Sequence, residues 1–277
     1  MSKPLAFVAF VVVSFLLGSK PEPMTPDPDG PRPIDILDTV FIEEMTWMEV
    51  RDAMRAGKDT VIIATGGVEQ NGPYLATGKH NYVLRATTAA IARKLGNALV
   101  APIVAFVPEG DFDPPTLHMK YPGTISVTEE TYQALVTDIC RSFRTHGFRH
   151  IVLIGDSGGN QTGLQEVAAK LNQKWGTGKT RVYYVAEYYN FEDVGKWLEQ
   201  RGIRQESEGL HDDFGMTAVI LSVDPTAVRM EQRIAANKFR INGIELAPAG
   251  KTMEWGRRIV DFRAEAATRA IRKARGK

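Results

Sequence analysis

The segment Gly66-Gly67-Val68-Glu69-Gln70-Asn71-Gly72-Pro73-Tyr74-Leu75 is the most informative part of this chain. It follows a short apolar run at residues 61–64 and precedes a run with helical periodicity at residues 82–95. A buried strand, a glycine-rich loop with one carboxylate and then a helix is how α/β proteins present chemistry at the carboxyl ends of their strands. We therefore expect Glu69 to lie at the edge of a sheet.

The rest of the chain alternates strand patterns with helix patterns. Short apolar runs predict strands at residues 60–65, 98–107, 150–155 and 181–185, with Pro102 interrupting the second of them. Helical periodicity covers residues 47–56, 82–95, 128–145, 163–175 and 254–275. Residues 217–223 fit either a strand or a helix. The alternation predicts a single α/β domain with a mainly parallel sheet and helices on both faces.

The N-terminal residues differ in composition from this domain. Residues 1–19 combine a basic residue with an apolar run of about 13 residues, a pattern typical of a secretory signal peptide. The run is shorter than the ~20 residues of a membrane span, and the alternative is an uncleaved anchor. Residues 20–33 contain six prolines and predict a disordered leader. We expect an exported protein, periplasmic or extracellular, without a stable membrane anchor after processing, whose folded domain covers residues 34–277.

The net charge and the single cysteine restrict the partners and the reactions that we expect of this chain. The net charge is +1, so the chain has no field that attracts polyanions, and nucleic acid is not an expected partner. The single cysteine, Cys140, cannot form an internal disulfide. Its place on the apolar face of a predicted helix favours a buried hydrophobic role over a nucleophilic one.

Three further blocks follow the Glu69 loop. They are His118 with Tyr121-Pro122-Gly123-Thr124, the run from His146 to Asn160 with Gly155-Asp156-Ser157-Gly158-Gly159, and Leu210-His211-Asp212-Asp213 with Met216-Thr217. In this order the four blocks resemble those of the creatininase (creatinine amidohydrolase) family of metal-dependent amidohydrolases. The resemblance extends from about Phe41 to Arg229 and implies that residues 217–223 form a helix.

The resemblance implies roles for some residues and losses at others. Glu69 matches the first metal-ligand glutamate of the family, and His211 matches a family general acid/base. The family's remaining ligands have changed: a histidine has become Asn71, the bridging aspartate aligns with His80, and another histidine has become Ser157. A later glutamate is Met216.

The changed positions still carry ligand chemistry. Glu69, His80 and Asp156 offer two carboxylates and an imidazole, which suits one divalent metal, Zn²⁺ first and Mn²⁺ or Fe²⁺ as alternatives. For Glu69 the alternative is a carboxylate satisfied by loop N–H groups, and for His80 a surface imidazole.

Other polar residues complete the expected site. Asp212 or Asp213 lies beside His211, and we predict His211 and Asp213 as catalytic residues. Asn71, His118 and Ser157 are the predicted substrate contacts, with a purely structural role as the alternative for His118.

The resemblance implies a metal-assisted attack of water on an amide-like C–N bond of a small molecule, and a hexameric assembly. Two other functions stay open. One is a ligand-binding protein that has kept the fold without catalysis. The other is a metal-free hydrolase with Ser157 as its nucleophile. The run Gly155-Asp156-Ser157-Gly158-Gly159 also matches chymotrypsin-like proteases, but a strand–helix alternation does not fit their two β-barrels.

Overall fold

The structure is a computed structural model that describes residues 26–276. The chain divides into two units, Met1–Asp35 and Ile36–Lys277, and every named helix and strand belongs to the second. The expected signal peptide, residues 1–19, lies outside the described residues. Among residues 26–276, no helix combines the length and the apolar character that a membrane crossing requires.

A four-stranded parallel sheet forms the centre of the second unit. Its order is β2 (Ala98–Val100), β1 (Thr60–Thr65), β3 (His150–Gly155) and β4 (Arg181–Tyr184). The central pair runs in register from Thr60 opposite His150 to Thr65 opposite Gly155, so both strands end at the same level. This sheet confirms the predicted α/β class, and Glu69 and Asp156 follow the two strands that end together.

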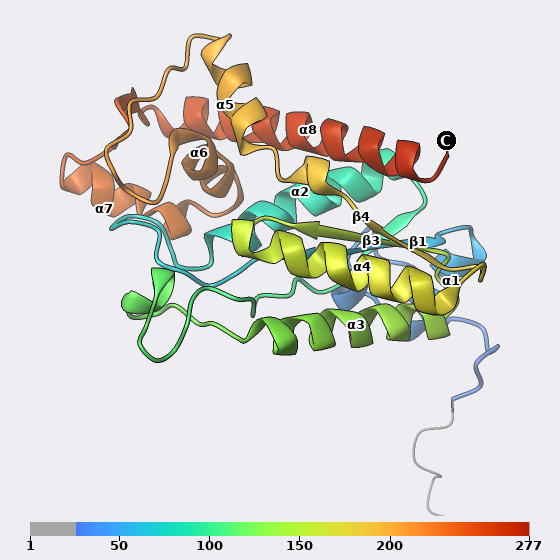
Figure 1. The fold of residues 1–277 in the computed structure, drawn as a ribbon. Helices are drawn as coiled ribbons and strands as arrows, with labels where there is room; N and C mark the ends of the chain where they lie inside the picture. The colour runs from blue at the N-terminus through green and yellow to red at the C-terminus, as the bar shows by residue number, and fades with distance from the viewer. Residues whose placement is uncertain (1–25, 277) are drawn as a thin grey trace, which may run out of the picture. The chain divides into compact units, whose positions relative to one another are not determined.

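Helices cover both faces of the sheet (Figure 1). One face carries α1 (Trp47–Arg55), α3 (Glu129–Thr145) and α4 (Gln161–Trp175), and the other carries α2 (Lys79–Leu95) and α8 (Ala249–Ala274). Successive side chains of a strand point to opposite faces, so β1 sends Val61 and Ile63 into one core and Ile62 and Ala64 into the other. All four are fully buried, as a sheet covered on both sides requires.

A third hydrophobic core lies beyond the carboxyl ends of the strands. It is built from α5 (Phe191–Glu199), α6 (Phe214–Val223), α7 (Met230–Ala235) and the hairpin of β5 (Arg240–Ile241) and β6 (Ile244–Glu245). Helix α6 is buried over Phe214–Leu221 and packs against α8. Because it is apolar on all sides, its sequence has no helical periodicity, which explains why residues 217–223 also fitted a strand.

Short 3₁₀ segments complete the unit at Ile42–Glu44, Leu117–Lys120, Gly158–Asn160, Ala186–Tyr188 and Pro225–Val228. Two expected boundaries change. The strand predicted at residues 98–107 ends at Val100, two residues before Pro102, and only isolated bridges continue at Val104 and Val107. Helix α2 begins at Lys79, so Lys79 and His80 lie on its first turn, whereas the sequence suggested a loop.

Candidate functional site

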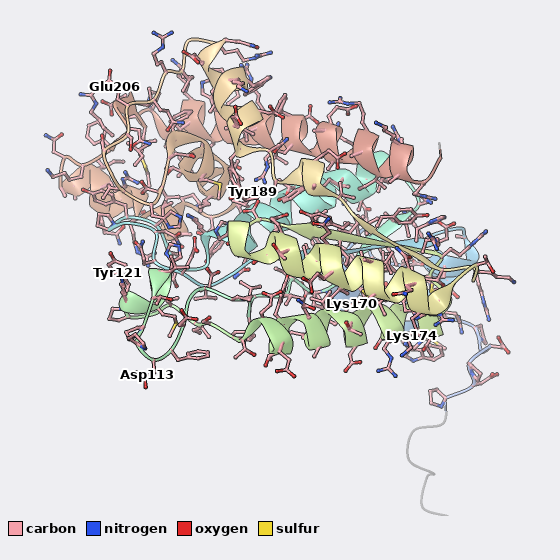
Figure 2. The ribbon with its side chains drawn as sticks, in the orientation of Figure 1. Asp113, Tyr121, Lys170, Lys174, Tyr189 and Glu206 are labelled. Atoms are coloured by element: carbon pink, nitrogen blue, oxygen red, sulfur yellow. The ribbon has the colours of Figure 1, made fainter. Side chains whose placement is uncertain are left out.

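A cavity of about 420 Å³ opens where β1 and β3 end. Its floor includes Glu69, His80 and Asp156, and its walls come from the loop around His118 and from residues 210–213. Tyr189, labelled in Figure 2 beside this end of the sheet, also lines the cavity. The carboxyl edge of a parallel sheet is where α/β folds bind ligands, so the cavity is the candidate site.

The glycine-rich loop holds the Glu69 side chain inside the protein. Gly67 has a φ of 151°, and a Cβ there would lie 2.1 Å from Glu109 Oε1, so only glycine fits. The Asn71 amide donates to the carbonyl oxygens of Glu69, Ala76 and Thr77 at 2.8, 3.1 and 3.2 Å. These bonds close the loop on itself and leave Glu69 only 1% exposed.

Four cationic or imidazole groups surround the Glu69 carboxylate. Its Oε1 atom accepts from His80 Nε2 at 2.9 Å and lies 3.3 Å from Lys79 Nζ. The same atom lies 3.5 Å from His211 Nδ1, and Oε2 lies 3.3 Å from His118 Nε2. Burial alone raises the pKa of Glu69, but the hydrogen bond from His80 and the charges of His80 and Lys79 hold that pKa far below its usual range.

His80 links Glu69 to Asp156 and is committed at both ring nitrogens. Its Nδ1 atom lies 2.7 Å from Asp156 Oδ2, while Nε2 is held by Glu69. Burial lowers the pKa of His80, but the hydrogen bonds to Asp156 and Glu69 outweigh burial and raise it. His80 is therefore an imidazolium that donates to two buried carboxylates.

Asp156 is neutralised from its other side by Arg263 of α8. Arg263 Nη2 donates to Asp156 Oδ1 at 2.7 Å, and the guanidinium lies over the rings of Tyr188 and Phe191. Burial raises the pKa of Asp156, but the charge of Arg263 and the contacts with His80 bring it below its ordinary value. Both Asp156 oxygens and both His80 nitrogens are thus used within the protein.

The remaining two imidazoles face the cavity as a stacked pair. The rings of His118 and His211 lie 4.5 Å apart at 26°. His211 Nδ1 donates to the Gln70 carbonyl at 2.9 Å, which places the proton on Nδ1 in this arrangement. Burial and the charge of Lys79 lower the pKa of His211, so the ring is neutral at pH 7.

Glu69, His118 and His211 bring one ligand atom each within 4.8 Å of one another. One carboxylate and two imidazoles are a donor set that Zn²⁺ and Mn²⁺ use. To bind such a cation, His211 Nδ1 has to leave the Gln70 carbonyl, and the ammonium group of Lys79 has to move away from Glu69. The three residues fit one divalent cation, while the commitments of His80 and Asp156 leave no free ligand atoms for a second.

The predicted site residues reach different places. The predicted ligands Glu69, His80 and Asp156 come together, but as an ion-pair chain, and their ligand roles stay predictions. His118, His211 and Ser157 line the cavity. Asp213 also lines it, but its Oδ1 caps α6 by accepting from Met216 N at 2.7 Å.

Asn71 is the predicted contact that the structure places elsewhere. It is 1% exposed and is not among the residues that line the cavity. Its side-chain amide instead donates to carbonyl oxygens of the Glu69 loop. Its expected role at the substrate is therefore replaced by a role in shaping the Glu69 loop.

Sequence reasoning missed three ionisable residues of the site. Lys79 is 4% exposed beside Glu69, and Arg263 is 1% exposed beside Asp156. Burial together with the negative charge of Glu69 raises the pKa of Glu109 to about 9. The adjacency of Lys79 and His80 was the only available signal, because Arg263 reads as one more basic residue of an amphipathic helix.

Comparisons with known proteins agree with the fold described above. The family model Creatininase (creatinine amidohydrolase) matches residues 43–271. A 3-dehydro-scyllo-inosose hydrolase of Thermotoga maritima is 24% identical over 192 residues, and a creatinine amidohydrolase of Pseudomonas putida is 28% identical over 116 residues. These alignments cover 69% and 42% of this chain, and they span 58% and 44% of the two relatives.

The fold is also found among solved structures. One named "Creatininase Mn" superimposes with a TM-score of 0.61 at 21% identity, covering 85% of this chain and 98% of the other. At this identity the superposition speaks for the fold alone.

Proposed function

This chain belongs to the creatininase family, and from that premise we propose that it is a hydrolase of a small amide, cyclic or open, assisted by one divalent cation. Glu69, His118 and His211 would hold the cation. The observation that supports the proposal is the convergence of their ligand atoms at the floor of a cavity. Three protein ligands beside open space are the usual form of a catalytic zinc site.

When bound, such a cation activates water and polarises a carbonyl group. The chain's own residues add charge and shape. Lys79 and His80 keep Glu69 ionised, and Lys79 lines the cavity as a buried positive charge that can face a developing oxyanion. Gly158 and Gly159, also in the wall, leave room for a substrate beside Ser157.

His211 has two candidate uses. The sequence predicted a general acid/base, and that role stays a prediction. We assign His211 to the cation, because its Nδ1 lies 3.5 Å from Glu69 Oε1 and its ring stacks on His118. The metal content of a His211→Ala variant separates the two uses.

The alternative with a Ser157 nucleophile finds less support. Among the described residues, no hydrogen bond joins the Ser157 hydroxyl to an imidazole, and the neighbouring His80 uses both nitrogens on carboxylates. A serine needs an adjacent base to act as a nucleophile at neutral pH.

The test begins with protein stripped by a chelator. We expect titration with Zn²⁺ or Mn²⁺ to give one bound cation per chain, and the loaded protein to hydrolyse a member of a panel of cyclic and open amides that includes creatinine. His118→Ala should bind the cation at least tenfold more weakly, whereas His146→Ala, an exposed histidine at the end of α3, should bind it normally.

Protein that binds no cation, or His118→Ala with unchanged affinity, would contradict the proposed site. A loaded protein without turnover of any amide would favour the non-catalytic ligand-binding alternative.

We also propose export and a homo-oligomer. Export is supported by the composition of residues 1–33, and an oligomer by family resemblance.

A further inference from the structure

Three unpartnered oxygen atoms mark the cavity wall. Among the residues that line the cavity, the buried polar side-chain atoms without a hydrogen-bond partner are Asp212 Oδ1, Asp212 Oδ2 and Glu109 Oε1. All three are acceptors on carboxyl groups. A buried acceptor without a partner costs about 1–3 kcal/mol, so such atoms in a cavity wall indicate donors that arrive with a ligand.

Asp212 is the more exceptional of the two residues. Its side chain is 9% exposed, and among the described residues it forms no ion pair within 4.0 Å. The charge that most favours the ionised form of Asp212 is that of Arg233, whose Nε and Nη2 donate to the carbonyl oxygens of Lys238 and Arg240 and whose guanidinium lies over the ring of Tyr74.

The cations at the cavity floor and behind it already contact other carboxylates, whereas Asp212 has no ion-pair partner among the described residues. Lys79 and His80 contact Glu69, and Arg263 contacts Asp156. Asp212 is therefore the cavity-lining carboxylate whose two oxygens both lack a protein partner, and Phe191 lines the same cavity. A planar amidinium or guanidinium can donate to both oxygens of a carboxylate at once, and an ammonium can donate to one of them.

We infer that Asp212 is the recognition carboxylate of this cavity and that it binds a cationic N–H group of the substrate, an amidinium, guanidinium or ammonium. The inference rests on the proposed function only in taking the cavity as the substrate site. His211, one residue earlier, faces Glu69, so Asp212 places the cationic end of the substrate beside the reacting end.

The test uses two probes of the same shape on the full chain. Benzamidine is a cation, and benzamide is its neutral counterpart. By calorimetric titration we expect the wild-type protein to bind benzamidine at least tenfold more tightly than benzamide. Asp212→Asn should bring the two dissociation constants to within about twofold, because it keeps the shape and removes the charge.

Glu208→Gln is the matched control. Glu208 is an exposed carboxylate of the same segment and lies outside the cavity lining, so this variant should keep the preference for benzamidine. The melting temperature is a second readout. Removal of an unpartnered buried charge should leave it equal or higher in Asp212→Asn.

Each other result overturns the inference. An absent preference in the wild-type protein, or one that survives Asp212→Asn, means that Asp212 does not recognise the cation. A lower melting temperature, or a failure to fold, means that Asp212 is a structural partner of Arg233. The proposed function fails separately, through cation content and turnover: protein without bound metal that still prefers benzamidine would leave the recognition role in place.

Discussion

The ionisable side chains on the two sides of the cavity differ in how completely they are paired within the protein. On the inner side His80, Asp156 and Arg263 form a buried chain in which every ligand atom of His80 and Asp156 has a protein partner. On the outer side His118, His211 and Asp212 line the cavity, and both Asp212 oxygens lack a protein partner. Glu69 belongs to both sides, through Oε1 to His80 and through Oε2 to His118.

The difference distinguishes the residues that hold the site in shape from the residues that can contact a ligand. The inner residues come from helices and a strand end, and their mutual pairing fixes Glu69 in place. Of the outer residues, His118 belongs to the short 3₁₀ segment Leu117–Lys120, and His211 and Asp212 belong to a loop, where side chains can adjust to a ligand. A buried charge that is fully paired is a poor candidate for a ligand contact. An unpaired buried charge is a better one, because its burial costs free energy that an oppositely charged ligand can offset.

Glu69→Gln should have the largest effect, because it should lower both the stability of the protein and its affinity for the cation. Lys79 and His80 would lose their shared carboxylate, which costs about 3–5 kcal/mol of stability for a broken buried ion pair. The cation would lose its only charged ligand. Urea denaturation and elemental analysis measure the two losses.

Wild-type cation content in Glu69→Gln would remove Glu69 from the ligand set. Unchanged stability would show that Lys79 and His80 do not depend on it.

Arg263→Met should damage the inner side alone. The change leaves Asp156 buried without its guanidinium partner, and we expect about 3–5 kcal/mol less free energy of unfolding. The folded fraction should still bind the cation. Arg269→Met, an exposed residue of the same helix in an i,i+4 pair with Glu265, should cost about 0.5 kcal/mol or less. Equal denaturation midpoints for the two variants would show that the pairing of Arg263 with Asp156 does not stabilise the fold.

His211→Ala should damage the outer side alone. We expect turnover to fall about 10²–10⁴-fold while the denaturation midpoint changes little, because the ring is partly exposed. Loss of the cation together with activity supports the ligand role. Loss of activity with full cation content supports the general acid/base role. A folded, loaded and fully active variant would leave His211 with neither.

Ser157→Ala should have the smallest effect. In a hydrolase that uses activated water, the hydroxyl only shapes the cavity wall, so the rate should fall about tenfold or less, which is about 1.4 kcal/mol in the barrier. A fluorophosphonate probe should not label the wild-type protein. A collapse of turnover with unchanged cation content would instead identify Ser157 as a nucleophile.

The strands and the edge at which they end could be predicted from the sequence. Apolar runs of strand length separated by helical periods identified β1 and β3. Asp156 follows β3 directly, and Glu69 lies in the loop that follows β1. The rule that parallel strands present chemistry at their carboxyl ends then placed the two carboxylates together.

The partners of those carboxylates could not be predicted. Arg263 lies on a helix rich in basic residues, and periodicity does not tell which of them faces inward when the inward face meets an ion pair. His118 belongs to a short 3₁₀ segment and His211 to an irregular loop, and the course of both segments depends on tertiary contacts. Helix α6 is apolar on all sides because it is buried, so its sequence shows no alternation of apolar and polar residues with a helical period.

The pairing of Arg263 with Asp156 has a consequence for the order of folding. The two residues are separated by 107 positions, and Arg263 belongs to the last helix that the structure describes. During synthesis Asp156 is therefore made long before Arg263, the residue whose charge neutralises it. Such long-range contacts make folding slow. We therefore expect the site to be completed only after α8 has docked.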